Sequence, residues 1–298
     1  MRLRGGILYL STSAVLLLSL PFAYGLMGER SATGDSAAIY VLKNYLQASY
    51  ARDYRQAYAY ISALDRRLKD ERSYVRERGA FNGFTLEVAK QLASTIEVHP
   101  LETRIEHDRA RLRLKIKLPD AGKLGSLLLN WDSERLNTLS VRQRREIIET
   151  LTKQRKAGKL EMLEGEESFE LVKESGTWKI FLDWAAGVKI KFQTTLASGA
   201  TIETKLVQTE VVTKPGELFN IALRIRNNSK QELTARIGHL VDPHGVRDHL
   251  DLVECGFLLP VRLLPQKEEE FTSTYLLRGG LPEGVRELTV TYAFALLK

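Results

Sequence analysis

The C-terminal third of the chain alternates between short apolar runs and clusters of turn-forming residues. Seven runs recur, at 188–195, 202–212, 218–227, 232–241, 251–257, 269–277 and 286–297. Proline, glycine and asparagine separate several of them, as in Lys214-Pro215-Gly216 and Arg278-Gly279-Gly280. Many short strands with frequent turns and no helical periodicity are typical of a two-layer β fold. The sequence therefore predicts an immunoglobulin-like β-sandwich over residues 185–298.

Residues 37–184 have a mixed pattern, which predicts an α+β domain. Apolar residues recur at three- and four-residue steps over 39–50 and 54–61, and a charged helical stretch covers 65–77. Residues 110–118 alternate strictly, and two more strands are expected at 167–172 and 177–184. Between them, Ser140 and Gln143 have the spacing of a capping box that opens a helix ending at Gly158.

Two of these elements have a basic side. The strand at 110–118 places Arg111, Arg113, Lys115 and Lys117 on one face. The helix after Ser140 carries six basic residues, namely Arg142, Arg144, Arg145, Lys153, Arg155 and Lys156. An anion or lipid headgroup site is one interpretation of the strand, but a solvated outer face is favoured.

The order of helices followed by a meander of strands over residues 36–184 resembles the cone-shaped fold of the nuclear transport factor two and ketosteroid isomerase superfamily. That resemblance rests on element order and implies a fold able to enclose a small-molecule pocket. Acid and base groups are present as Asp53, Asp70, His99 and His107, but no spacing pairs them. We therefore expect a binding or spacing module here, and no enzyme.

The first 28 residues form a separate segment. Arg2 and Arg4 precede an uncharged run of 21 residues, 7–27, which matches the ~20 residues needed to span a bilayer as a helix. The alternative is a cleaved signal peptide, since Ala23-Tyr24-Gly25 resembles a cleavage site. Both interpretations put the bulk of the chain on the exported side, beyond a linker at 29–36, and the membrane anchor is favoured slightly.

Net charge does not favour nucleic acid. The formal charge of +7 divides into +2 for residues 1–28, +4 for 29–183 and +1 for 184–298. Since no domain is overwhelmingly basic and an exported chain meets little nucleic acid, we expect no such partner. A weak attraction to anionic lipid or to an acidic membrane partner is retained.

The residues with the clearest chemical meaning lie between 239 and 255. These 17 residues hold three of the five histidines and the only cysteine. Thiolate and imidazole are ligands that Cu(I) and Zn(II) prefer. The structural alternative is a small buried cysteine with solvated loop histidines. Spacing alone leaves both open.

Residues 188–297 resemble the CtaG-type copper chaperones of cytochrome c oxidase assembly, which are membrane-anchored proteins with an exported β-sandwich. The matching features are Val207-Gln208, Val211, Gly216-Glu217, Arg226-Asn227-Asn228-Ser229, His239-Leu240-Val241-Asp242-Pro243, Cys255-Gly256-Phe257, Pro265 and the final strand 288–294. The resemblance implies Cu(I) bound through two cysteines separated by one residue. Here the first falls on Cys255 and the second position is Phe257.

One thiolate is too little for soft Cu(I), so another group must replace the lost sulfur. His244 and His249, on the loop before Cys255, are candidates for a mixed sulfur and nitrogen site. Alternatively, two copies of the chain share copper between two Cys255 thiolates in a homodimer. His239 alternates with Ile237 and Val241, so it is expected to be a satisfied core histidine.

The sequence thus predicts a single-pass membrane protein with its bulk in the periplasm, which carries Cu(I) to cytochrome c oxidase or a related membrane copper enzyme. Two alternatives stay open. One is a metal-free scaffold or assembly factor that has lost copper binding. The other is a small-molecule-binding protein or enzyme that acts through the cone-like domain.

Overall fold

The computed structural model describes residues 32–120, 123, 133–196 and 200–297. The chain divides into two compact units. Unit 1 extends to Leu182, and unit 2 runs from Asp183 to the C-terminus and also includes residues 76–78. The predicted segment 1–28 lies outside the described residues. No helix within the described part is long and apolar enough to span a membrane.

Unit 1 begins with five helices, α1 (Ala32–Tyr50), α2 (Tyr54–Ala59), α3 (Ala63–Arg66), α4 (Glu71–Arg78) and α5 (Gly83–Ala93). Helix α1 starts inside the expected linker, because small and polar residues suit a first helical turn as well as a linker. The expected helix at 65–77 is two helices: Asp70 accepts a hydrogen bond from the Ser73 amide (2.7 Å) and so caps a new start. Helix α5 was not predicted, although Phe84, Val88 and Leu92 are buried at four-residue steps.

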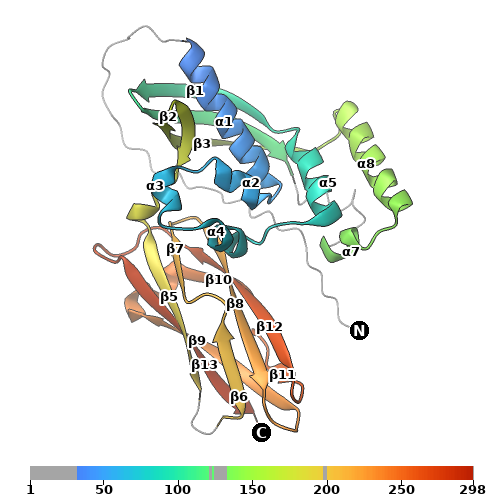
Figure 1. Cartoon of the computed structure of the whole chain (residues 1–298), viewed down its shortest axis with the longest axis vertical. Helices are drawn as coiled ribbons and strands as arrows, with labels where there is room; N and C mark the ends of the chain where they lie inside the picture. Colours follow the sequence, from blue (N-terminus) through green and yellow to red (C-terminus); the bar gives the residue numbers. More distant parts are fainter. Residues whose placement is uncertain (1–31, 121–122, 124–132, 197–199, 298) are drawn as a thin grey trace. The chain divides into compact units, whose positions relative to one another are not determined.

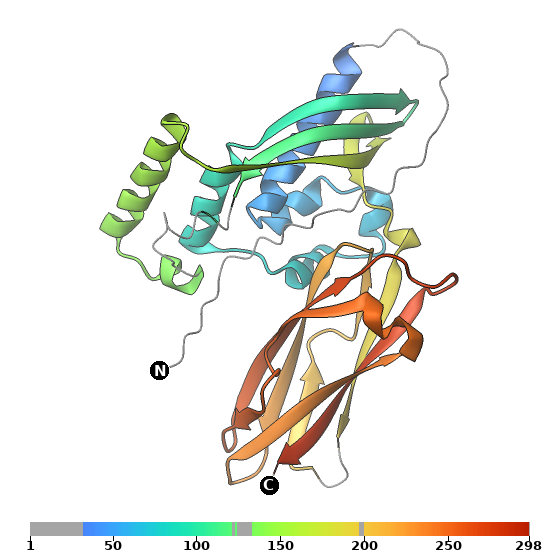
Figure 2. The same cartoon turned by 180° about the vertical axis from the view of Figure 1, so that it is seen from behind.

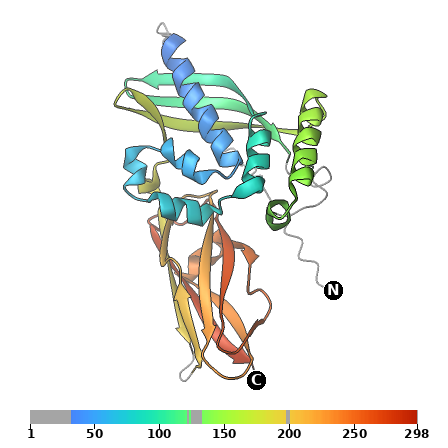
Figure 3. The ribbon, with the colours of Figure 1, turned by 45° about the vertical axis from the view of Figure 1, so that its right-hand side comes forward.

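The sheet of unit 1 is an antiparallel meander in the order β1-β2-β3-β4, with β1 (Glu97–Glu106), β2 (Arg109–Pro119), β3 (Met162–Glu174) and β4 (Thr177–Phe181). Helix α1 crosses one face and contacts β1 and β4 (Figure 1; Figure 3). Helices α7 (Ser133–Asn137) and α8 (Val141–Lys156) lie between β2 and β3 in sequence. The capping box of Ser140 and Gln143 is confirmed at the start of α8.

The strand predicted at 110–118 is confirmed as β2, with Leu112 and Leu114 buried and its arginines exposed. Its basic residues face a row of glutamates: Arg111 pairs with Glu170 (2.6 Å), and Lys115 and Lys117 both pair with Glu164 (2.6 and 2.9 Å). Hydrogen bonds from the two lysines lower the pKa of Glu164 to about 2. The face is therefore solvated and electrically compensated. The likeness of unit 1 to the cone-shaped fold stays a prediction.

Unit 2 is the predicted β-sandwich (Figure 2). One sheet has the order β10-β12-β8-β6, with β10 (Leu250–Cys255), β12 (Glu268–Leu277), β8 (Leu218–Asn227) and β6 (Ile202–Leu206). The other has the order β11-β9-β13-β5-β7, with β11 (Val261–Leu263), β9 (Leu233–Asp242), β13 (Glu287–Leu297), β5 (Val188–Leu196) and β7 (Glu210–Thr213). Pairing is antiparallel except between β5 and β13.

The core of unit 2 consists of the alternate residues of these strands. Ile221, Leu223 and Ile225 of β8 face Ile190 of β5 and Val290 of β13 across the sandwich, and all five are fully buried. Two boundaries differ from the sequence expectation. The run at 202–212 is two strands, β6 and β7, that belong to different sheets, and the run at 251–257 ends at Cys255.

Candidate metal site

Cys255 is the last residue of β10, an edge strand, and its side chain points into the sandwich. Its partner across the ladder is Ser273 of β12, which is fully buried, and paired residues of an antiparallel ladder project to the same face. The Ser273 hydroxyl lies 3.9 Å from the Cys255 sulfur. Cys255 is half-buried and packs against the core. The free thiol thus sits at the margin of the interior.

A cluster of polar side chains fills the interior beside Cys255. The hydroxyl of Tyr275 on β12 donates to that of Tyr292 on β13 (2.9 Å), so the pair bridges the two sheets. Burial raises the pKa of both tyrosines, which keeps them neutral. Ser273 also hydrogen-bonds to Tyr292, and the nearby Cys255 contributes further to the raised pKa of both tyrosines. A buried polar network of this kind stabilises the fold most when every polar group in it has a hydrogen-bond partner.

His239 is the exception in that cluster. His239 lies on β9, opposite Tyr292 of β13, and the two rings are 4.9 Å apart, centroid to centroid. Its Nε2 is buried and has no hydrogen-bond partner among the described residues. Burial lowers the pKa of the imidazole and so favours its neutral form. The sequence predicted a satisfied core histidine; the structure places a half-buried His239 among core aromatic rings, and its Nε2 has no partner among the described residues.

Phe257, at the position of the missing second cysteine, also points inward. It is 3% exposed, and its ring lies 5.6 Å from that of Tyr292 and 6.1 Å from that of His239. Residue 257 therefore occupies the same interior region as Cys255 and the unpaired His239 nitrogen. Gly256 between them sits tightly against β12, where an added Cβ would come within 3.1 Å of the Thr272 carbonyl.

His244 and His249 lie elsewhere. Both belong to η2 (His244–His249), a short 3-10 turn that precedes β10. His249 directs Nδ1 toward the carbonyl of Gly279 (3.1 Å), and His244 is exposed. His249 is at the opposite end of β10 from Cys255; five extended residues lie between them, so their backbones are roughly 20 Å apart. The described residues contain no group of three or more histidine, cysteine or carboxylate side chains able to hold a metal.

The surface next to Cys255 is apolar. Leu258 and Leu259 follow Phe257 and are 81% and 76% exposed, and Val253 on β10 is 51% exposed. Single exposed apolar residues are ordinary, but three around one thiol are consistent with a protein contact.

The acid and base groups singled out in unit 1 have local structural roles. Asp53 caps α2 by accepting from the Gln56 amide and pairs with Lys90 (2.6 Å), and Asp70 caps α4. His99 is exposed beside Glu97 (3.2 Å), and His107 occupies the turn between β1 and β2.

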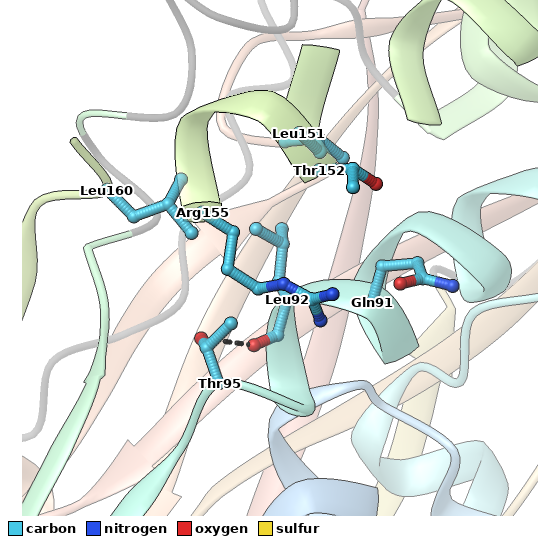
Figure 4. A pocket seen from close by; sticks show the side chains of 7 residues that line it. All are labelled: Gln91, Leu92, Thr95, Leu151, Thr152, Arg155 and Leu160. Carbon is cyan, nitrogen blue, oxygen red and sulfur yellow. Dashed lines mark hydrogen bonds between the residues drawn. The ribbon is translucent and has the colours of Figure 1, made fainter. Parts of the chain in front are cut away.

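A small pocket lies between α5 and α8 (Figure 4). Its lining comprises Gln91, Leu92, Thr95, Leu151, Thr152, Arg155 and Leu160, and it contains no carboxylate. Its enclosed space, about 10 Å³, suits about one water molecule. It is not the deep pocket with paired carboxylates that the enzyme alternative requires.

Sequence reasoning found Cys255 and Phe257 but missed the contribution of His239 and the tyrosine pair. Alternation along β9 places His239 on the inner face, and the same pattern gives Tyr275 and Tyr292 inner positions. The alternation does not say which inner side chains meet across the sandwich. That depends on the register of strands from two different sheets.

The fold and the inward-facing thiol define unit 2 as a β-sandwich domain with a candidate soft-metal site at its edge. Residues 161–295 match the family described as cytochrome c oxidase assembly protein CtaG/Cox11. The suspected relationship is thereby confirmed for that part of the chain. The matched segment begins before the sandwich and so also covers all of β3 and β4.

Other comparisons add little. A search of curated proteins gave no match. Among solved structures, a mutant of Salmonella alpha-2-macroglobulin aligns at 9% identity over 68% of this chain and 16% of that chain. Its TM-score of 0.20 supports no argument about fold or function.

Proposed function

We propose that this chain assists the assembly of cytochrome c oxidase, or of a related membrane copper enzyme, as a carrier of Cu(I). The observation that carries the proposal is the CtaG/Cox11 match over residues 161–295, within which Cys255 points into the edge of the sandwich. In this proposal residues 1–28 anchor the chain, the rest lies on the periplasmic side, and the protein has no enzymatic activity. Copper is its cargo.

The chemistry of the site supports low-coordinate Cu(I). A thiolate and a neutral imidazole are both ligands for this soft ion. Among the described residues, His239 Nε2 is a buried ring nitrogen without a hydrogen-bond partner, and its ring lies 6.1 Å, centroid to centroid, from that of Phe257, two positions after Cys255. We therefore propose Cys255 as the obligate ligand and His239 as the second one. His244 and His249, the ligands expected from sequence, would require η2 to leave its present position.

Few ligands also suit delivery. A site with one thiolate and one imidazole releases Cu(I) by exchange when a client presents a better set of sulfur ligands. Leu258 and Leu259, exposed beside the thiol, supply the contact surface for that client.

Copper titration of the full chain in detergent micelles, against a chromophoric Cu(I) chelator, tests the proposal. We expect one Cu(I) per chain, a loss of affinity of more than roughly 100-fold in Cys255→Ser, and X-ray absorption with sulfur and nitrogen in the first shell. His249→Ala is the matched control for His239→Gln, and only the second should lose the nitrogen signal. If the chain binds no Cu(I), or if Cys255→Ser binds it with the wild-type affinity, the proposed carrier function is wrong.

The same titration separates the shared-dimer arrangement. If two Cys255 thiolates hold one ion, the stoichiometry is one Cu(I) per two chains, sedimentation shows a copper-dependent dimer, and X-ray absorption shows sulfur alone. His239→Gln then leaves copper affinity unchanged.

A second candidate function is a metal-free assembly scaffold. Phe257 favours it, because a fully buried aromatic ring stands where the family has a thiolate, while the apolar surface of Val253, Leu258 and Leu259 is retained. In that case the chain binds no Cu(I), and Leu258→Ser with Leu259→Ser weakens the association with the client that Cys255→Ser leaves intact.

A further inference from the structure

Helix α8 holds a concentration of positive charge that the rest of unit 1 does not share. Residues 141–159 contain seven basic and two acidic side chains, a net charge of +5. Residues 29–183 as a whole carry only +4. The excess charge of this part of the chain therefore sits on one helix and the turn after it.

The two basic stretches of unit 1 differ in how their charge is balanced. On β2 the basic residues pair with glutamates of β3, so little of their charge acts at a distance. On α8, by contrast, Arg145, Lys153 and Lys156 form no ion pair with any described residue. Both β2 and α8 carry a row of basic residues, but only the row on β2 is balanced by acidic partners.

The unpaired cations share one face. Positions 145, 153 and 156 follow the four- and three-residue steps that align side chains along a helix, and all three residues are exposed. Val141, one step before Arg145 on the same face, is 74% exposed. Leu151 on the opposite face is buried toward α5. Glu149 lies among the cations and reduces the positive charge of the face without cancelling it.

Next to this face, the pocket between α5 and α8 presents hydrogen-bond donors. Arg155 extends from α8 across the pocket toward α5, where it contacts the Ser94 hydroxyl (3.3 Å), and Gln91 lines the same pocket (Figure 4). Thr95 and Thr152 already donate to the carbonyls of Leu92 and Ile148, so the free donors are those of Arg155 and Gln91. Guanidinium and amide groups at a pocket mouth suit a phosphate oxygen.

We propose that α8 is a docking surface for an anionic phospholipid membrane, with the face of Arg145, Lys153 and Lys156 against the headgroups and one phosphate at Arg155. An extended row of cations with an apolar residue at its end fits the charged, planar surface of a bilayer. This surface belongs to unit 1 and involves none of the residues proposed for copper. The inference goes beyond the proposed function, and copper titration does not affect it.

Hydrogen exchange of the full chain in lipid nanodiscs tests the inference. We compare discs of neutral phosphatidylcholine with discs that contain about 30% phosphatidylglycerol, and follow the peptides that cover α8. Since each basic residue near an anionic surface contributes about 1 kcal/mol, losing three weakens docking by roughly 100-fold. We expect several-fold slower exchange of α8 in the anionic discs, lost in 0.5 M salt and in Arg145→Gln/Lys153→Gln/Lys156→Gln.

The matched control is Arg111→Gln/Arg113→Gln/Lys115→Gln, which removes the same formal charge from the compensated face of β2. It should keep the protection of α8. Exchange that is equal in both discs overturns the proposal, as does equal loss of protection in the two triple variants, which would mean a response to net charge alone. Protection produced in neutral discs by inorganic phosphate would overturn the lipid assignment in favour of a free anion. Unchanged exchange across the rest of unit 1 verifies that each variant is folded.

Discussion

Asn227 shows how much of the sandwich depends on one buried amide. It is fully buried at the end of β8, its side-chain nitrogen donates to the carbonyls of Gln231 (2.8 Å) and Leu263 (2.9 Å), and its oxygen accepts from the Ser229 amide (2.9 Å). The side chain thus ties the β8–β9 turn to β11. Removing it takes a partner from the buried Leu263 carbonyl and from the Ser229 amide, while the Gln231 carbonyl still accepts from the Ser229 hydroxyl (2.8 Å). Leaving a buried polar group unpaired costs more than the bond itself is worth.

We predict that Asn227→Ala lowers the free energy of unfolding of unit 2 by about 3 kcal/mol. Chemical denaturation monitored by circular dichroism measures the change. Asn228→Ala is the matched control. The side chain of Asn228 is exposed, so we expect the free energy of unfolding to change by no more than about 0.5 kcal/mol. Equal effects of the two substitutions would contradict the structural role assigned to Asn227.

His239 makes a pH-dependent contribution to stability. Burial holds its pKa in the folded state below the ordinary value of 6.5. Between these two pKa values the unfolded chain binds a proton that the folded chain does not, so stability falls as the pH drops below 6.5 and levels off beneath the folded pKa. We predict that His239→Gln removes this part of the pH dependence.

Urea unfolding between pH 8 and pH 5 measures that slope in wild type and variant. His99→Gln, which makes the same substitution at an exposed histidine, is measured alongside as the control. A profile that His239→Gln leaves unchanged would mean that the pKa of His239 does not differ between the folded and unfolded chain.

At the scale of elements, the end of β10 decides between copper carrier and scaffold. Cys255 and residue 257 both point inward, so a cysteine at 257 would face the same interior region as the first thiol. We predict that Phe257→Cys raises Cu(I) affinity, because two thiolates replace one. The same change removes a buried ring and costs about 3 kcal/mol of stability.

Phe257→Leu separates the two effects, since it also shortens the buried side chain without supplying sulfur. It should lose part of the stability and leave copper affinity at the wild-type level. Chelator competition and urea unfolding on the three proteins give both quantities. If Phe257→Cys gains no affinity, the two positions do not converge on one ion and the family's thiolate geometry does not apply here.

The elements differ in how far their sequences predict them. Strand β8 runs over 218–227 as expected, because its turn residues and its strict alternation agree. The prediction of one strand over 202–212 is wrong, because β6 and β7 pair in different sheets and no local sequence pattern encodes that division. The prediction that His239 has its hydrogen bonds satisfied is wrong for a related reason. Its inward position follows from alternation, whereas its unpaired nitrogen depends on neighbours from β13 and on Phe257. Local periodicity predicts which face of a strand a residue lies on. The register of strands in the folded protein decides which side chains it contacts.

At the scale of the whole molecule, each unit has a core of its own. Leu42, Leu112 and Ile180 are buried in unit 1, and Ile190, Leu223 and Val290 in unit 2. Units with separate hydrophobic cores are each large enough to unfold cooperatively. We predict two transitions in calorimetry of the full chain in micelles, and Asn227→Ala assigns them: it should lower the melting temperature of one by several degrees and leave the other in place. Leu112→Ala should do the reverse, because it empties space only in unit 1. A single transition that both substitutions shift equally would show that the chain unfolds as one cooperative body, and the α+β unit could then not be treated as an independent addition to the sandwich that matches the CtaG/Cox11 family.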